Sequence, residues 1–299
     1  MSIRKQVNQH MHQNWAGLSL AALSQQIAQQ LLAVGILEAE QETKLLFSKV
    51  FGPDVWQQIL EPDQQPTQKQ IIELAPLLQR RLAREPLSHI LGEKGFWTLD
   101  LEVNTDVLTP RADTEKLVEV ALALTHEQPT GRVLDLGTGS GAVLLAFLSE
   151  RAGWSGTGID ISDPAIAVAK RNATRAGLTQ RANFICTNWA KLDGSDYDLL
   201  LSNPPYIASQ EIDELPIEVR QHEPRIALDG GDDGLDAYRF LVAHLDKWLR
   251  PNGGFAFEIG CTQAQQVTQI LEQTGFARAI ATHLDLADRE RVVCGQMEH

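Results

Sequence analysis

The feature that most constrains the fold is a regular alternation of short apolar segments with longer helical patterns between residues 132 and 259. Parallel strands need a crossover between them, and a helix in each gap returns the chain to the start of the next strand. We therefore predict an α/β fold, a Rossmann-like sheet with helices on both faces. The apolar segments, which look like buried strands, are residues 132–136, 157–160, 183–186, 197–202 and 254–259.

The end of the chain departs from this alternation. Residues 279–284 and 291–295 also look like strands, but the gap between them has no room for a crossover helix. Two strands joined by so short a connection can pair only antiparallel. The sequence thus predicts a sheet of seven strands whose last strand is antiparallel, the pattern of class I methyltransferases.

The first part of the chain follows a helical pattern instead. Apolar residues recur at helical spacing within residues 20–34, 39–50 and 71–82. Thr67 and Gln70 have the spacing of a capping box at the start of the third helix. Pro76 lies inside that helix and predicts a kink or a break, because proline removes a helical hydrogen bond.

Residues 96–103 alternate between apolar and polar side chains, which is typical of strands or a hairpin. We therefore predict four segments along the chain. They are a polar leader over residues 1–17 that can be disordered, a small helical domain over 18–90, a strand or hairpin linker over 91–110, and the α/β domain over 111–299.

Charge and cysteine content exclude several classes of protein. The 299 residues carry a formal net charge of −13, which disfavours broad binding to a nucleic-acid backbone. No two of the three cysteines have the CxxC spacing, so neither a zinc site nor a disulfide framework is predicted. No stretch approaches the roughly 20 apolar residues of a membrane span, and the first residues lack the apolar run of a secretory signal. We expect a cytoplasmic protein.

A glycine-rich turn follows the first strand of the α/β domain. Gly137, Gly139 and Gly141 would let the backbone approach a ligand and present its N–H groups. Asp135, just before the turn, is unsuited to a pyrophosphate but suits a cationic amino-acid group. Asp160 ends the next strand and can accept hydrogen bonds from both hydroxyls of a ribose. A dinucleotide remains open at this point, although the glycine spacing differs from its GxGxxG fingerprint.

A second motif follows the strand over residues 197–202. Asn203, Pro204, Pro205 and Tyr206 lie where ligands bind in open α/β sheets, at the carboxyl end of a strand. The prolines have no N–H, so the side-chain oxygen of Asn203 and the carbonyl of Pro204 remain as acceptors. Two adjacent acceptors suit a planar –NH2 group, and the Tyr206 ring can lie against an amide or a base.

Together with other segments, these motifs make the chain similar to the release factor glutamine methyltransferases. The likeness runs from about residue 18 to 296 and is carried by residues 85–92, 108–115, 135–141, 203–207, 222–228, 230–236 and 285–292. It implies an enzyme that transfers a methyl group from S-adenosyl-L-methionine and leaves S-adenosyl-L-homocysteine. The target that it implies is the side-chain nitrogen (N5) of the glutamine in the Gly-Gly-Gln motif of class 1 peptide-chain release factors.

The resemblance also assigns roles to residues. The substrate amide would be held by Asn203, Pro204, Pro205 and Tyr206, of which Asn203, Pro204 and Tyr206 are the expected catalytic residues. At position 188 this chain has asparagine where the family commonly has aspartate, and asparagine can still hydrogen-bond to adenine. The expected cofactor-binding residues are Asp135, Gly137, Thr138, Gly139, Ser140, Gly141, Asp160, Asn188, Trp189 and Asn203.

Other features leave alternatives open. Arg111 and Glu223 are candidates for substrate binding, but a salt bridge from Glu223 to Arg111 or to Arg225 explains them equally well. No metal is expected, because the methyl carbon of a sulfonium is already electrophilic. The helical domain is expected to dock the release factor. The alternative functions are methylation of a ribosomal-protein glutamine, methylation of adenine N6 in a nucleic acid, and cofactor binding without catalysis.

Overall fold

The computed structural model describes residue 15 and residues 17–194 and 196–298. The chain divides into two compact units, residues 1–91 and residues 92–299. Most of the leader predicted over residues 1–17 lies outside the described residues. Trp15 is described, and its side chain is buried in the core of the first unit. Most of the segment predicted as a linker, from residue 92 on, belongs to the second unit.

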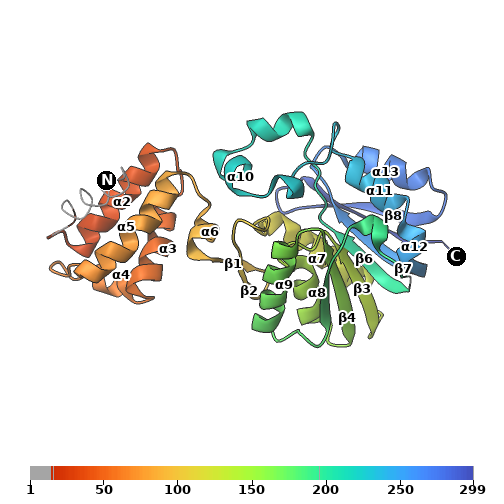
Figure 1. Ribbon diagram of the computed structural model, residues 1–299, viewed down its shortest axis with the longest axis horizontal. Coiled ribbons are helices and arrows are strands. Elements are labelled where there is room, and N and C mark those ends of the chain that lie inside the picture. Colours follow the sequence, from red (N-terminus) through yellow and green to blue (C-terminus); the bar gives the residue numbers. More distant parts are fainter. Residues whose placement is uncertain (1–14, 16, 195, 299) are drawn as a thin grey trace. The chain divides into compact units, whose positions relative to one another are not determined.

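The first unit is helical throughout its described elements. The apolar faces of its helices share one core, in which Leu23, Ile27, Leu46 and Leu74 are fully buried. A stripe of apolar side chains at helical spacing produces this packing. The helices are α2 (Leu20–Ala33), α3 (Ala39–Phe51), α4 (Val55–Gln58), α5 (Gln68–Leu82) and α6 (Leu87–Leu91) (Figure 1).

Helix α5 confirms one expectation and corrects another. The capping box is present, with Thr67 accepting from the Gln70 backbone and the Gln70 side chain accepting from the Thr67 backbone. Of the kink or break predicted at Pro76, a break does not occur, because α5 runs through this residue. Pro76 is exposed whereas the neighbouring Ala75 and Leu78 are buried. Packing of the buried face compensates for the hydrogen bond that proline removes from the helix.

The second unit contains the predicted sheet. Within the described residues it has seven strands in the order β5-β4-β3-β6-β7-β9-β8. The pairs among the first five are parallel. Strand β9 pairs antiparallel with β8, as the short connection between them requires, and also with β7. The strands are β3 (Gly131–Leu136), β4 (Trp154–Asp160), β5 (Ala182–Cys186), β6 (Tyr197–Ser202), β7 (Leu249–Glu258), β8 (Ala277–Leu284) and β9 (Glu290–Met297).

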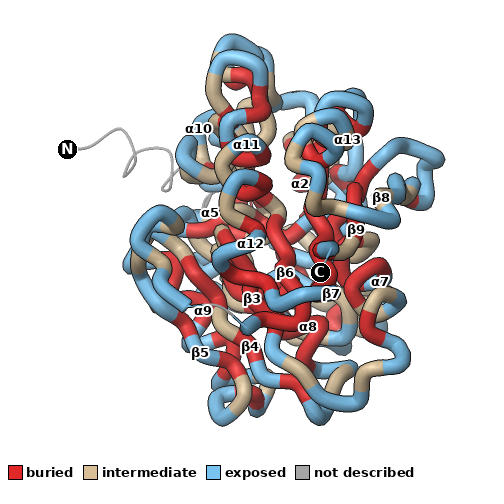
Figure 2. Tube along the Cα trace, turned by 90° about the vertical axis from the view of Figure 1, so that its right-hand side faces the viewer, coloured by how far each residue is buried: buried red, intermediate tan, exposed pale blue. Residues whose placement is uncertain are grey.

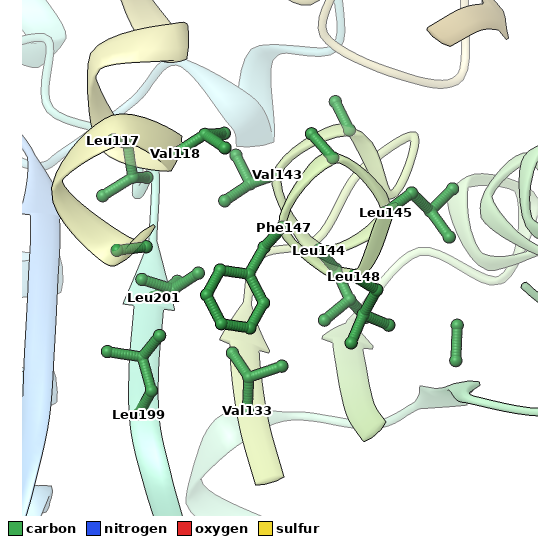
Figure 3. Packing of buried hydrophobic residues seen from close by; sticks show 14 of the residues in the cluster. Leu117, Val118, Val133, Val143, Leu144, Leu145, Phe147, Leu148, Leu199 and Leu201 are labelled. Carbon is green, nitrogen blue, oxygen red and sulfur yellow. The ribbon is translucent and has the colours of Figure 1, made fainter. Parts of the chain in front are cut away.

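Helices cover both faces of the sheet, so the central strands are buried along most of their length (Figure 2). Alternate residues of a strand point to opposite faces. Val133, Leu199 and Leu201 therefore pack with α7 (Glu115–Leu124), α8 (Ala142–Glu150) and α9 (Asp163–Arg175), as Figure 3 shows for α7 and α8. Leu134 and Leu200 pack on the other face with α11 (Asp236–Val242), α12 (Leu245–Trp248) and α13 (Ala264–Glu272).

Shorter elements complete the second unit. Strands β1 (Glu93–Phe96) and β2 (Leu99–Glu102) form the predicted hairpin, antiparallel from Glu93 opposite Glu102 to Phe96 opposite Leu99. The long connection from β6 to α11 holds a parallel bridge between Ile207 and Asp229. The short helices are η1 (Ala112–Thr114), η2 (Trp189–Lys191), η3 (Ser209–Glu214), α10 (Ile217–His222) and η4 (Arg225–Ala227).

The sheet topology fixes where a ligand can bind. The side on which successive strands are added to the sheet changes between β3 and β6. Strands β4 and β5 follow β3 on one side, and β6 and β7 follow on the other. In open α/β sheets ligands bind at such a switch point, beyond the carboxyl ends of the strands. That edge carries Asp135 and Asp160 at or near the ends of β3 and β4, Asn203 after β6, and Glu258 at the end of β7.

We expect the second unit to fold without the first, because it has its own hydrophobic cores and domains of this size usually do so. A protein comprising residues 92–299 should show the circular dichroism of an α/β fold and one cooperative thermal transition. The full chain, treated identically, is the control. Loss of a cooperative transition in the shorter protein would contradict independent folding.

Candidate active site

A cavity of about 530 Å³ opens at the carboxyl edge of the sheet. It lies within the size range of small-molecule sites. A smaller cavity of about 50 Å³ adjoins it and shares Leu108, Gly137, Gly139 and Asn203 with it. Of the residues predicted from the sequence, the two cavities together are lined by Arg111, Asp135, Gly137, Thr138, Gly139, Ser140, Asp160, Asn188, Trp189, Asn203 and Pro205.

The remaining predicted residues line neither cavity but lie close to those that do. Gly141 is the N-cap of α8, in the left-handed conformation with φ 81°. A Cβ there would come within 3.2 Å of Leu145 and 3.3 Å of Ala169 and Phe184, so only glycine fits without displacement. Pro204 is buried beside Asn203. Tyr206 and Glu223 contact other residues of the site, as described below.

The glycine turn uses its N–H groups differently from the prediction. The N–H groups of Gly137 and Thr138 both donate to the carbonyl of Ile159 at 2.9 Å. The N–H of Gly139 donates to Asp160 Oδ2 at 2.9 Å, and that of Gly141 to the Thr138 carbonyl at 2.8 Å. The expectation that the turn presents these groups to a ligand was wrong, because the turn folds back onto the end of β4. Such a turn is unsuited to binding a pyrophosphate.

The carboxylate of Asp160 is held in a fixed direction by the backbone. Its Oδ1 accepts from the N–H of Ser162 and its Oδ2 from that of Gly139, both at 2.9 Å. Burial raises the pKa of this carboxyl, and the backbone hydrogen bonds oppose the rise. Each oxygen of a carboxylate can accept a further hydrogen bond. The side chain lines the larger cavity, so it can bind two neighbouring hydroxyls there.

Asp135 is buried at the smaller cavity, where its Oδ2 accepts from the Thr138 hydroxyl at 2.6 Å. Burial raises the pKa of Asp135 to about 7, and the Thr138 hydrogen bond opposes that rise. A cation in the cavity would stabilise the ionised form of this carboxyl. The position thus suits the ammonium group of an amino acid.

Trp189 and Asn188 form another wall of the larger cavity. A Cβ on Gly137 would lie 3.3 Å from Trp189 Cζ2, so the indole ring packs against the glycine turn. Phe240 lies beside this ring, with ring centroids 6.3 Å apart. Asn188 Oδ1 accepts from the Ala190 N–H at 2.8 Å and so caps η2. Aromatic rings next to a polar amide suit a flat heterocycle.

Asn203 stands at the switch point itself. The strand before it is tied to β3, because the Ser202 hydroxyl donates to the Leu136 carbonyl at 2.6 Å. The side-chain Nδ2 of Asn203 donates to Thr114 Oγ1 at 3.3 Å. With Nδ2 turned toward Thr114, the side-chain Oδ1 is the group left to accept a hydrogen bond from a ligand.

Tyr206 is anchored at its backbone and at its hydroxyl. Its carbonyl accepts from Gln263 Nε2 at 2.9 Å, and its hydroxyl lies 3.5 Å from Glu258 Oε1. Burial and the charge of Glu258 raise the pKa of Tyr206, so the hydroxyl stays protonated. A Cβ on Gly234 would lie 2.3 Å from the Tyr206 carbonyl oxygen, which makes glycine necessary there.

Arg111 and Glu223 bind each other. Arg111 Nη2 donates to both carboxylate oxygens of Glu223 at 2.7 Å, and the Glu223 side chain is only 1% exposed. Burial raises the pKa of Glu223, and Arg111 and Thr109 oppose the rise. The ion pair joins the loop at Leu108, which lines both cavities, to the segment at Pro224, which lines the larger one. The salt bridge to Arg111 is thus confirmed, while substrate binding by these residues stays a prediction.

Two residues of the site were not predicted from the sequence. Thr114 and Glu258 are both buried, and each contacts the Asn203–Tyr206 segment, Thr114 at the Asn203 side chain and Glu258 at the Tyr206 hydroxyl. Glu258 could have been found by the rule that gave Asp160, since it ends a strand at the same edge of the sheet. Thr114 had no such signal, because threonine before a helix is usually only a cap.

Comparison with known proteins identifies the family. A family model described as the PrmC N-terminal domain matches residues 22–92, and one described as a methyltransferase domain matches residues 127–295. The release factor glutamine methyltransferases of Caulobacter vibrioides and Rhodospirillum rubrum are 44% and 43% identical to this chain. The matches cover 87% and 92% of this chain and 90% and 84% of those proteins. The chain belongs to the release factor glutamine methyltransferase family.

Members of this family are methyltransferases that use S-adenosylmethionine. This chain is therefore an S-adenosylmethionine-dependent methyltransferase. Among solved structures, the hMettl16 catalytic domain in complex with the MAT2A 3′UTR hairpin 6 aligns with a TM-score of 0.55 at 15% identity. The alignment covers 76% of this chain and 81% of that one. At this identity the likeness concerns the fold, which confirms the Rossmann-like methyltransferase sheet.

Two features are absent from the part of the chain that the structure describes. No group of three or more histidine, cysteine, aspartate or glutamate side chains there could hold a metal ion. Within the same residues, no helix combines the length and the apolar character that crossing a membrane requires. The absence of a metal and the cytoplasmic location remain predictions from the sequence.

We expect the change Asp160→Ala to weaken binding of S-adenosylmethionine while the fold persists. Loss of a hydrogen bond to a charged group costs about 1.5–3 kcal/mol, roughly a 10- to 150-fold rise in Kd. Titration calorimetry measures the affinity, and thermal unfolding serves as the control for folding. An unchanged Kd would show that Asp160 does not bind the ribose.

Proposed function

We propose that this enzyme transfers a methyl group from S-adenosylmethionine to the side-chain nitrogen of the glutamine in the Gly-Gly-Gln motif of class 1 release factors. The observation that carries the proposal is the orientation of Asn203. Its Nδ2 is engaged by Thr114, so Oδ1 can accept a hydrogen bond beside the cavity. An acceptor fixed there matches the –NH2 group of a glutamine amide. The names of the relatives support a release factor as the substrate.

The residues at the edge of the sheet fit S-adenosylmethionine. The buried carboxyl of Asp135 would bind the ammonium group of its methionine part, since a cation there offsets the cost of ionising this carboxyl. Asp160, held by two N–H groups, would accept hydrogen bonds from the ribose hydroxyls. Asn188 and Trp189 would hold the adenine. Gly137, Thr138, Gly139, Ser140 and Gly141 would shape the wall of the site rather than donate hydrogen bonds.

When bound, S-adenosylmethionine supplies an electrophilic methyl carbon; the N–C bond forms as the C–S bond breaks, and sulfur keeps the electron pair. The glutamine nitrogen is a weak nucleophile, so its position decides the rate. Asn203 Oδ1 and the Pro204 carbonyl would accept from its –NH2 group and stabilise the positive charge that develops on the N–H bonds. Tyr206 would pack against the flat amide. The proton then leaves to water, which balances the reaction without a metal.

Mass spectrometry of a purified release factor tests the proposal. After incubation with the enzyme and S-adenosylmethionine, one added methyl group is expected on the glutamine of the Gly-Gly-Gln motif. Parallel samples contain a large-subunit ribosomal protein and an adenine-containing DNA or RNA. Methylation of one of these samples, with none of the release factor, would replace the proposal by one of the two alternative functions.

Asn203→Ala should lower kcat by roughly 10²-fold or more, because one preorganised partner of the transition state is lost. Affinity for S-adenosylmethionine should fall only moderately, since Asp135 and Asp160 still bind it. Asn203→Asp retains an acceptor and should keep more activity than Asn203→Ala. A near-normal kcat in Asn203→Ala, with only a raised KM for S-adenosylmethionine, would refute the acceptor role of Asn203.

We further propose that the helical unit docks the release factor, because a single side chain gives a protein substrate few contacts. The protein comprising residues 92–299 should then methylate a short Gly-Gly-Gln peptide as fast as the full chain does. Its kcat/KM for the intact release factor should be strongly reduced. Equal kcat/KM values of the two proteins on the intact release factor would refute docking by the helices.

A further inference from the structure

We infer that Thr114 and Glu258 are positioning residues that set the direction of the Asn203 side chain, so that its oxygen rather than its nitrogen faces the substrate amide. The inference rests on the proposed function, because it explains how the acceptor at Asn203 is oriented. Neither residue belongs to the Asn203–Tyr206 motif. Thr114 closes η1, before α7, and Glu258 ends β7.

The direction of an asparagine side chain matters because its two ends are similar in shape but opposite in hydrogen bonding. The oxygen accepts, whereas the nitrogen only donates. If Asn203 presented Nδ2 to a glutamine –NH2 group, two donors would face each other. Something must therefore hold the side chain in one of its two orientations, and Thr114 is its hydrogen-bond partner at 3.3 Å.

The hydroxyl of Thr114 is available for this task. Thr114 is the N-cap of α7, a position where threonine usually accepts a hydrogen bond from the helix backbone. Among the described residues it makes no such bond, because η1 leads directly into α7 and Thr114 itself has helical dihedral angles, φ −67° and ψ −18°. Its buried hydroxyl instead accepts from Asn203 Nδ2 at 3.3 Å, and Glu258 is the acidic group nearby.

Glu258 fixes the direction of the Thr114 hydroxyl. A hydroxyl has a single hydrogen, and a carboxylate can only accept. When Thr114 donates to Glu258, its lone pairs are left for Asn203, which must then turn Nδ2 toward it. This order of donors belongs to the ionised carboxylate, because a protonated carboxyl carries an O–H that can itself donate to Thr114. The inferred order of donors is therefore Asn203 Nδ2 to Thr114 Oγ1, which lie 3.3 Å apart, and then Thr114 to Glu258.

The position of Glu258 is itself rigid. Its carbonyl accepts from the Tyr238 hydroxyl at 2.8 Å, and its backbone pairs with Val292 of β9. Its side chain is buried and also contacts the Tyr206 hydroxyl through Oε1. Arg291, the cation facing it, is shared with Asp113 and Asp285, at 3.2 and 3.1 Å. Glu258 therefore contacts Tyr206 at one end of the motif directly, and it acts on Asn203 at the other end only through Thr114.

The experiment compares Thr114→Val, which keeps the shape but loses the hydroxyl, with Thr114→Ser, which keeps the hydroxyl. Thr114→Val should lower kcat by about 10- to 100-fold, with little change in the KM for S-adenosylmethionine, and Thr114→Ser should restore most of the rate. Glu258→Gln should lower kcat less, since an amide oxygen can still accept. Thr125→Val is the matched control. Thr125 is also buried, at the other end of α7, and its hydroxyl donates to the Ala121 and Leu122 carbonyls of that helix.

Two further measurements test whether Thr114 acts through Asn203. In the Asn203→Ala background, Thr114→Val should cause no additional loss of kcat, as expected when one residue acts through the other. The side-chain NH2 signal of Asn203, identified in a nitrogen-15 spectrum by its loss in Asn203→Asp, should shift in Thr114→Val and stay in place in Thr114→Ser. This spectrum needs no release factor, so it tests the orientation even if the substrate proposal fails.

Equal losses of kcat in Thr114→Val and Thr114→Ser, or a loss as large in Thr125→Val, would show that packing matters and would overturn the inference. An unshifted Asn203 signal in Thr114→Val would also overturn it. A wild-type enzyme that leaves the release factor unmodified contradicts the proposed function alone.

Discussion

The parallel pairing of β3 with β6 in the middle of the sheet is the interaction on which the rest of the site depends. It brings together the ends of two strands that are more than sixty residues apart, with Asp135 opposite Leu201. The Ser202 hydroxyl fastens this junction by donating to the Leu136 carbonyl. The strands that follow β3 and those that follow β6 lie on opposite sides of this pair. The loops after the two strands therefore diverge and leave a cavity between them. The residues proposed to bind the cofactor and those proposed to bind the substrate meet at this point.

The site also depends on polar groups buried at a cost to stability. Burial raises the pKa of both Asp135 and Glu258 to about 7, so neither carboxyl is stabilised in its ionised form as much as water would stabilise it. Of the oxygens of Glu258, Oε2 has no hydrogen-bond partner among the described residues. Such groups are expected where function requires them; Asp135 lines the smaller cavity, and Glu258 contacts Tyr206 of the proposed catalytic motif.

The glycine turn shows how similar sequences can serve different ligands. In a turn that binds a pyrophosphate, the N–H groups point at the phosphate oxygens. Here Gly137, Thr138 and Gly139 donate to the end of β4, and the turn instead orients the Asp160 carboxylate. A negative group at that place favours hydroxyls and cations over phosphates. Because these N–H groups are used inside the protein, the turn does not attract a phosphate. The neighbouring acidic side chains can therefore take part in binding a ligand with hydroxyls or a positive charge.

The sequence by itself determined the sheet and most of the residues that line the two cavities, because both depend on local patterns. Apolar runs mark the strands, the short gap after residue 284 makes the last strand antiparallel, and Asp160 and Asn203 follow strands directly. Of the kink or break expected at Pro76, the break does not occur, since packing of the buried helix face outweighs a local preference. The roles of Thr114 and Glu258 were decided only by the tertiary structure. These residues are separated along the chain, and they reach Asn203 and Tyr206 only because the sheet places the end of β7 beside the end of β6 and α7 above both.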